Sequence, residues 1–311
     1  MDYPGSDSAT GKSYTIESMK IIDGRSLAQE IKSEIKRETK QFIKQGGKTP
    51  HLAAVLVGDD GASQAYVRNK IKSCERVGFE STLIRKKSSL QEEELLEIVG
   101  QLNVNDDIDG FIVQLPLPKH IDENKVILAI DPVKDVDGFH PANLGRMMIG
   151  LPCYIPATPL GILTMLERYN IKTEGQNVVV IGRSNIVGSP MSILLSRKSK
   201  WGNATVTLTH SRTRDLVSEV QRADIVIAAI GIPQFITGDM VKEGAVVIDV
   251  GVNRVEMPGT EKGYKLVGDV DFDDVAPKAS YITPVPGGVG QMTVTSLLLN
   301  TLKAARREVY G

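Results

Sequence analysis

The chain has 311 residues, 24% charged and 41% hydrophobic, and its formal net charge is −1. This length suits a soluble globular protein with two domains and a sizeable core. The balanced charge excludes a strongly basic protein, so we expect no nucleic-acid or membrane partner, and no apolar run is long enough to span a bilayer. The two cysteines, Cys74 and Cys153, cannot form a disulfide framework, which favours a reducing compartment and hence the cytoplasm.

Residues 1–18 lack both apolar periodicity and the pattern of a secretory signal, and we interpret them as a tag or disordered extension. The first half of the chain then alternates between helical and strand-like patterns. We expect helices over 25–45, through 65–73 and around 90–103, and buried strands over 51–58, 81–86 and 110–118.

A connector over 150–161 contains three prolines and separates the first series from a second one. Four apolar runs then predict buried strands, and the whole series is typical of a doubly wound parallel sheet of the Rossmann kind. The four runs are 177–182, 204–210, 224–231 and 245–251.

The last segment, 291–309, predicts a helix with an apolar stripe at Val294, Leu297, Leu298 and Leu302. We expect it to return to the first lobe. The fold class is therefore α/β with two lobes: a first domain of residues 19–157 plus 287–311, and a Rossmann-type domain of residues 158–286. A cleft between such lobes is a favoured place for ligands.

A glycine-containing loop follows the first strand of the second series, in "VVVIGRSNIVGSP" (178–190). It is similar to a dinucleotide fingerprint, but Gly182-x-Ser184 stands in place of G-x-G, and the next glycine is Gly188. Gly188 opens a helix whose N-terminus attracts a pyrophosphate. A structural turn without a ligand is the alternative.

The second strand of that series ends in His210, Ser211 and Arg212, without the carboxylate that usually binds the ribose of NAD. A hydroxyl and guanidinium groups, with Arg183 in the glycine loop, favour the 2′-phosphate of NADP, although both arginines also suit a solvated surface. Val252 follows the fourth strand, where a nicotinamide ribose would lie. We interpret Asp249 as a structural carboxylate.

Tyr66 and Lys70 lie four residues apart, so a helix places them on one face, with Ser63 nearby. The pair is either catalytic or part of a basic surface stripe. Short-chain dehydrogenases also use a Tyr/Lys pair, but there the cofactor loop comes first in the chain. Here the pair precedes that loop by more than a hundred residues.

Gln114 is a polar residue within an apolar strand pattern, and such a residue requires a hydrogen-bond partner or a ligand. Asp131, Asp135 and Asp137 follow in "DPVKDVDGFHP". They lack the spacing and the final glutamate of a calcium loop, so we expect no metal site. Turn capping is the ordinary role for most of them.

Several motifs occur in order along the chain: "SQAYVRNKIKSCERVGF", "VQLPLP", "KDVDGFHPANLGR", "VVVIGRSNIVGSP", "HSRT", "VIDVGVN", "GDVDF" and "TPVPGGVGQMT". Together they resemble the bifunctional methylenetetrahydrofolate dehydrogenase/methenyltetrahydrofolate cyclohydrolase family over about residues 19–311. The resemblance implies NADP-dependent oxidation of 5,10-methylenetetrahydrofolate, then hydrolysis to 10-formyltetrahydrofolate, in a cytoplasmic homodimer of one-carbon metabolism. The first domain would bind folate and the second NADP.

The resemblance also implies roles for individual residues. Lys70 would be the cyclohydrolase residue, with Tyr66 and Gln114 beside it, and Asp137 would hold the pterin. The remaining expected folate contacts are Ser63, Val113, Leu115, Pro286, Gly287 and Gly290. The expected cofactor contacts are Gly182, Arg183, Ser184, Ser211 and Val252.

The residue types agree with this chemistry. Hydride loss leaves a cation delocalised over two nitrogens and requires alignment but no base. Hydrolysis requires a proton acceptor, and a lysine near a cationic ligand in a closed cleft loses its proton more readily. The alternatives are a monofunctional NADP-dependent dehydrogenase and a nucleotide-binding regulatory protein. Two positions depart from the family: Ala157 replaces a cysteine, and Gln291 replaces a proline that would suit a helix first turn.

Overall fold

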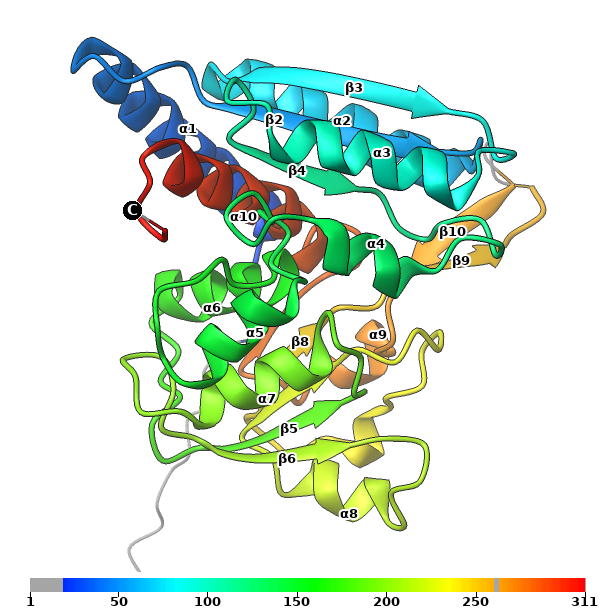
Figure 1. The fold of residues 1–311 in the computed structure, drawn as a ribbon. Helices are drawn as coiled ribbons and strands as arrows, with labels where there is room; N and C mark the ends of the chain where they lie inside the picture. The colour runs from blue at the N-terminus through cyan, green and yellow to red at the C-terminus, as the bar shows by residue number, and fades with distance from the viewer. Residues whose placement is uncertain (1–18, 260–262, 311) are drawn as a thin grey trace, which may run out of the picture.

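The computed structural model describes residues 19–259 and 263–310, so the extension predicted at 1–18 lies outside the described residues. The chain forms two α/β lobes, one above the other in Figure 1. Each lobe is built around its own parallel sheet, which confirms the predicted fold class. No helix among the described residues is both long and apolar enough to cross a membrane.

The first lobe holds a three-stranded parallel sheet in the order β3-β2-β4. Successive side chains of a strand point to opposite faces, and both faces of the central strand are buried. The elements of this lobe are α1 (Gly24–Lys44), β2 (His51–Val57), α2 (Gly61–Val77), β3 (Glu80–Lys86), α3 (Glu92–Asn103), β4 (Gly110–Val113) and α4 (Glu123–Ala129). Leu52 and Leu56 pack in the same core as α1 and α2, whereas Val55 packs with α3 and α4.

The second lobe holds a six-stranded parallel sheet in the order β1-β11-β8-β7-β5-β6. The strands are β1 (Lys20–Ile21), β5 (Asn177–Ile181), β6 (Thr205–Thr209), β7 (Ile225–Ala228), β8 (Val246–Asp249) and β11 (Tyr281–Ile282). The order reverses between β5 and β7, so a crevice forms there at the carboxyl ends of the strands.

Helices cover both faces of this larger sheet. On one face lie α6 (Ala157–Arg168) and α7 (Gly188–Ser196), with α5 (Pro141–Met148) against α7; on the other lie α8 (Leu216–Gln221), the short η1 (Gly238–Met240) and α9 (Phe272–Val275). An antiparallel hairpin of β9 (Asn253–Glu256) and β10 (Tyr264–Val267) extends toward the first lobe (Figure 1).

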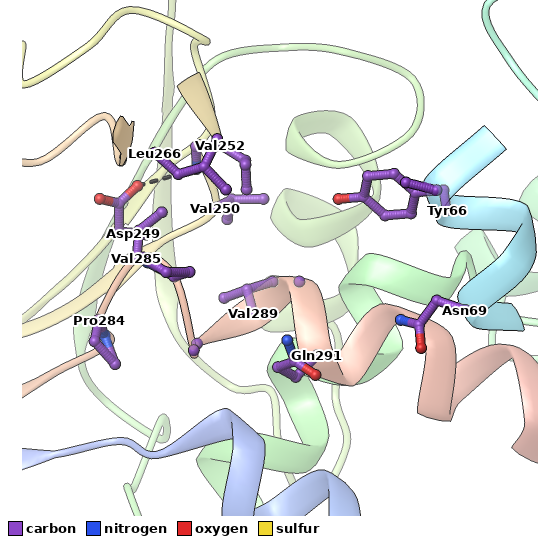
Figure 2. A pocket seen from close by; sticks show the side chains of 16 residues that line it. Tyr66, Asn69, Asp249, Val250, Val252, Leu266, Pro284, Val285, Val289 and Gln291 are labelled. Atoms are coloured by element: carbon purple, nitrogen blue, oxygen red, sulfur yellow. Dashed lines mark hydrogen bonds between the residues drawn. The ribbon is translucent and has the colours of Figure 1, made fainter. Parts of the chain in front are cut away.

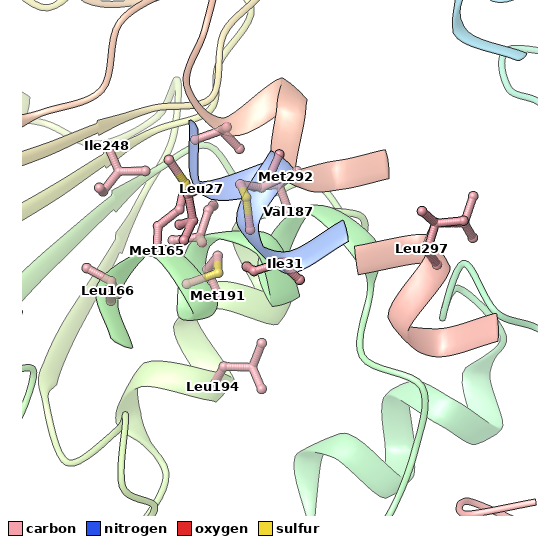
Figure 3. Close-up of a cluster of buried hydrophobic side chains, with 14 of the residues drawn as sticks. Leu27, Ile31, Met165, Leu166, Val187, Met191, Leu194, Ile248, Met292 and Leu297 are labelled. Carbon is pink, nitrogen blue, oxygen red and sulfur yellow. The ribbon is translucent and has the colours of Figure 1, made fainter. Parts of the chain in front are cut away.

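The last helix, α10 (Val289–Ala305), connects the two lobes. It packs against α6 on one side and against α1 and α2 on the other, as predicted for a helix that returns to the first lobe. Its predicted apolar stripe is buried: Val294, Leu297, Leu298 and Leu302 are all at most 2% exposed. Figure 3 shows part of this core, in which Met292 and Leu297 of α10 share one cluster with Met165 and Met191.

Several predicted boundaries were wrong for local reasons. The strand expected over 110–118 ends at Val113, because Pro116 and Pro118 have no N–H to donate to a neighbouring strand. Gln114 therefore follows the strand rather than lying within it. The last helix begins earlier than expected and ends at Ala305, where Arg307 adopts a left-handed conformation with φ 54°.

Strand β1 was not predicted, and it pairs with β11 in the larger sheet, although the sequence analysis assigned residues from 19 onward to the first domain. A two-residue strand has too little periodicity to be recognised from sequence. The boundary between residues 157 and 158 stays a prediction.

Candidate active site

A cavity of about 370 Å³ lies where α2, the end of β4 and the start of α10 meet the larger sheet. We call it the Lys70 cavity. Five predicted site residues line it from the first lobe: Ser63, Tyr66, Lys70, Gln114 and Asp137. Leu115 and Gly290 of the predicted set also line it. The structure therefore gathers residues that are more than two hundred positions apart in the sequence.

Lys70 is buried within this cavity and paired. Lys70 is only 7% exposed, and its Nζ donates a hydrogen bond of 3.1 Å to Oε1 of Gln114. The Gln114 amide in turn donates from Nε2 to the Leu115 carbonyl at 2.7 Å, which leaves Oε1 facing the lysine. The alternative of a solvated basic stripe therefore fails for Lys70.

Asp137 lines the same cavity and is half-buried. Burial raises the pKa of Asp137, and the positive charge of Lys70 opposes that rise. Within the described residues, its carboxylate has no hydrogen-bond partner. Two acceptor oxygens thus remain available to a ligand with adjacent N–H donors.

A second cavity, of about 230 Å³, adjoins the first, and we call it the Gln291 cavity (Figure 2). The two cavities lie side by side, because they share the lining residues Tyr66, Val250, Val252, Val289 and Gly290. The Tyr66 ring points into the Gln291 cavity from α2, opposite Val250 and Val252. Tyr66 is 41% exposed, which suits a residue that packs on a ligand rather than on the core.

The loop before α10 forms one wall of the Gln291 cavity, including the predicted Pro286 and Gly287. Gln291 itself lies in the first turn of α10, and its N–H donates to the Gly288 carbonyl at 3.1 Å. A proline at this position would lack that bond. The other departure, Ala157, is buried at the start of α6 and lines the Lys70 cavity.

The predicted cofactor residues lie at the carboxyl ends of three parallel strands: Gly182, Arg183 and Ser184 after β5, Ser211 after β6, and Val252 after β8. We call these five residues the cofactor edge. Arg183, Ser184 and Ser211 are exposed, as is the adjacent Arg212. No carboxylate ends β6, in line with the predicted preference for a 2′-phosphate.

The loop at this edge has the geometry that a dinucleotide requires. Gly182 has φ +109°, and a Cβ there would collide with the Ala229 carbonyl oxygen. A Cβ at Gly188 would collide with the Gly182 carbonyl oxygen, so the first turn of α7 lies directly against the strand end. Both glycines therefore permit an approach that no other residue allows, and the N-terminus of α7 faces the loop. These residues fit NADP.

Asp249, at the end of β8, has a structural role, as its interpretation from sequence proposed. It is 3% exposed and accepts hydrogen bonds from the backbone N–H groups of Gly251, Asp269 and Val270 at 2.9–3.0 Å. Burial raises the pKa of Asp249 to about 6, and the hydrogen bonds from Asp269 and Val270 oppose that rise.

One predicted folate contact lines neither of these two cavities. Val113 is 7% exposed and packs in the core beside α3 and α4, and it lines a smaller cavity together with Leu115, Asp137 and Phe139. Further residues line the cavities although their sequence pattern does not mark them as site residues: Phe139, Asn69, Thr158 and Thr293. Thr158 and Thr293 share a hydrogen bond of 3.0 Å between α6 and α10, a contact for which the sequence has no local signal.

Fold and site together define a two-domain, dinucleotide-dependent α/β enzyme whose cleft joins a buried Lys–Gln pair to the carboxyl edge of a Rossmann-type sheet. Protein-family comparison matches residues 22–137 to the catalytic domain of tetrahydrofolate dehydrogenase/cyclohydrolase and residues 156–309 to its NAD(P)-binding domain. The chain belongs to the tetrahydrofolate dehydrogenase/cyclohydrolase family, as the motifs predicted.

Individual relatives cover nearly the whole chain. The bifunctional protein FolD of Bacteroides thetaiotaomicron is 60% identical over 292 residues, which is 94% of this chain and 100% of the relative. The crystal structure of the bifunctional enzyme FolD from Campylobacter jejuni superposes with a TM-score of 0.87 at 46% identity, covering 94% of this chain and 100% of that one. The Trypanosoma brucei enzyme, complexed with NADP and an inhibitor, gives a TM-score of 0.89 at 38% identity, covering 95% and 100%.

Proposed function

We propose that the chain carries out both reactions of its family at the two adjoining cavities described above: NADP-dependent oxidation of 5,10-methylenetetrahydrofolate, and hydrolysis of the 5,10-methenyl product to 10-formyltetrahydrofolate. The observation that carries this proposal is the partly buried hydrogen bond between Lys70 and Gln114, in a cavity that Val250 and Val252 also line just after β8. A dehydrogenase alone has no use for this pair, which favours the bifunctional enzyme over a monofunctional one.

In the first reaction the protein aligns two ligands and moves no proton. Gly182, Arg183, Ser184 and Ser211 would hold NADP, which accepts a hydride when bound. Val252 lines both cavities, so it would adjoin cofactor and folate alike. Asp137 would accept the pterin N–H groups and fix the orientation of the substrate methylene carbon.

In the second reaction Lys70 would move protons while Gln114 fixes the position of its amine. A water oxygen bonds to the methenyl carbon, the bond from that carbon to N5 breaks, and the formyl group stays on N10. Two protons leave the water oxygen: one goes to N5 and the other to solvent. The Tyr66 ring would pack on the folate and narrow the site around the reacting carbon.

Absorbance of methenyltetrahydrofolate tests the proposal with the purified protein. With NADP and methylenetetrahydrofolate, we expect a methenyl signal that forms and then decays; with methenyltetrahydrofolate alone, we expect decay well above the uncatalysed rate. Decay at the uncatalysed rate, with oxidation intact, would contradict the cyclohydrolase and leave the monofunctional alternative.

We also propose a homodimer in the cytoplasm. Light scattering on the purified protein would measure the oligomeric state, and we expect a mass twice that of the chain. Fractionation of the native cell would test the cytoplasmic location.

A further inference from the structure

A buried aspartate lies two residues before Asp137 and outside the mechanism above. Asp135 is 2% exposed, and its carboxylate does not contribute to the described lining of the Lys70 cavity. Its Oδ1 accepts the N–H of Phe139 at 3.2 Å, and its Oδ2 accepts the N–H of His140 at 2.8 Å. The side chain thus closes a turn over 135–140 from within.

That turn presents two side chains to the Lys70 cavity, Asp137 and Phe139. Its beginning is held to the small sheet, because the Phe111 N–H of β4 donates to the Lys134 carbonyl at 3.0 Å. Its end is held by the two hydrogen bonds to Asp135. Because Asp137 has no hydrogen bond of its own among the described residues, the turn is what sets its position.

A second buried polar residue completes the support. Asn143 is 0% exposed, and its Nδ2 donates to Oδ2 of Asp135 at 2.9 Å. Its Oδ1 accepts the Tyr154 N–H at 3.2 Å and the Tyr310 hydroxyl at 2.9 Å. A chain of hydrogen bonds therefore runs from the C-terminal segment, through Asn143 and Asp135, to the turn that carries Asp137.

We propose that Asp135 is a positioning residue for folate binding, which together with Asn143 and Tyr310 holds the 135–140 turn so that Asp137 faces the pterin. The inference rests on the proposed role of Asp137. Burial raises the pKa of Asp135 to about 7, and the hydrogen bonds from His140 and Asn143 oppose that rise. The fold therefore retains a carboxyl group here at a cost in the free energy of folding.

The chemistry of the site explains why an aspartate stands there. Three N–H donors converge on the two oxygens of Asp135. An asparagine has the same shape but offers one acceptor oxygen, and its amide would bring a donor against another donor. Asp135→Asn therefore perturbs the turn with little change in volume. Asp131, which accepts the Val133 N–H at 2.9 Å in the preceding turn, supplies the matched control Asp131→Asn.

The first experiment measures both reactions in Asp135→Asn. We expect the KM for folate to rise about tenfold, the scale of losing a hydrogen bond to a charged group, with the KM for NADP and the kcat within about threefold. Asp131→Asn should match the wild type. A general loss of structure would instead change both KM values and the melting temperature together, and that result would overturn the proposal.

A double-mutant cycle then tests whether Asp135 acts through Asp137. If it does, Asp135→Asn should add little to the folate KM of Asp137→Ala, because the residue to be positioned is already gone. Independent, multiplying losses would overturn the inference while leaving the role of Asp137 intact. An unchanged folate KM in Asp137→Ala alone would instead show that the proposed function of that residue is wrong.

A milder variant keeps the test available should Asp135→Asn fail to fold. Tyr310→Phe removes one hydroxyl but keeps the ring against Tyr154, 5.9 Å between centroids, and under the Arg146 guanidinium at 4.7 Å. We expect the folate KM to rise about two- to threefold, the effect of one neutral hydrogen bond at a distance, with the KM for NADP unchanged. If the kinetics of Tyr310→Phe match those of the wild type with folate as well as with NADP, the proposal is overturned.

Discussion

The Lys70 cavity and the cofactor edge share Val252 but are built in different ways. In the Lys70 cavity, side chains hold one another: the buried Lys70 donates to the half-buried Gln114, and Asp137 is carried on a turn held by the buried carboxylate of Asp135. At the cofactor edge, two glycines let main-chain segments pack closely. Gly182 and the N-terminus of α7 shape the loop, while Arg183 and Ser211 are exposed.

This difference in construction between the two regions predicts which substitutions each of them tolerates. Solvent cannot replace a buried proton-transfer group, so the loss of that group removes the step that it catalyses. The side chains at the cofactor edge are exposed rather than packed in a core, so we expect their substitution to adjust which ligand is preferred. We therefore expect substitutions in the cavity to reduce catalysis or folate binding, and substitutions at the edge to change which cofactor is preferred.

The largest expected effect is in Lys70→Met. We expect the cyclohydrolase rate to fall by more than ~100-fold, the scale of general acid–base catalysis, while the fold and cofactor binding persist. Hydride transfer requires no base, so part of the dehydrogenase activity should remain. Lys72→Met, an exposed lysine on the same helix, is the control for loss of charge. Hydrolysis at the wild-type rate in Lys70→Met would remove Lys70 from the mechanism.

Asp137→Ala should have the next largest effect. Loss of the carboxylate removes the acceptors proposed for the pterin, so we expect the folate KM to rise about tenfold or more and the turnover to fall. The KM for NADP should change little, because the cofactor edge lies on the other lobe. Steady-state kinetics with each substrate varied would measure both, and unaltered folate kinetics would exclude Asp137 from the site.

Ser211→Asp tests the cofactor edge through specificity rather than activity. A carboxylate at the end of β6 would repel a 2′-phosphate, so we expect the preference for NADP over NAD to fall by about tenfold. The specificity constants for both cofactors are compared at one ionic strength. Ser33→Asp, which adds the same charge on the exposed face of α1, controls for net charge. Equal losses with the two cofactors would contradict the placement of the phosphate.

Gln291→Pro should have the smallest effect. The variant loses the hydrogen bond from the Gln291 N–H to Gly288, at 3.1 Å, but proline is tolerated in the first turn of a helix and restricts the unfolded chain. These contributions are each about 1 kcal/mol and oppose each other. We expect the melting temperature and the folate KM to remain close to those of the wild type. A large rise in the folate KM would show that the Gln291 amide itself contacts the ligand.

The sequence predicts the regular parts of this molecule well, because they depend on local patterns. Apolar runs identify the strands of the smaller sheet and β5, β6, β7 and β8 of the larger one, but not its short strands β1 and β11, and the glycine spacing identifies the loop at Gly182. The ordered motifs identify the family and the pair of Lys70 and Gln114, although only the structure shows their hydrogen bond.

What the sequence does not predict depends on contacts between distant segments. Val113 appears as a site residue by resemblance, but the pleat of β4 turns its side chain into the core. The support of Asp135 comes partly from Tyr310, which bonds to Asn143 across 167 positions. Pairing of β1 with β11 likewise joins the two ends of the described chain, and no local propensity encodes it.

That pairing has a consequence for how the protein can be made. Strand β1 belongs to the sheet of the second lobe, whereas α10, near the other end, fills the core beside α1 and α2 of the first. During synthesis the first lobe therefore lacks a helix of its core until α10 has left the ribosome. Strand β1 likewise cannot pair until β11 has been synthesised. Neither lobe should be obtainable alone by cutting the gene at the connector, since each would lack a piece held by the other.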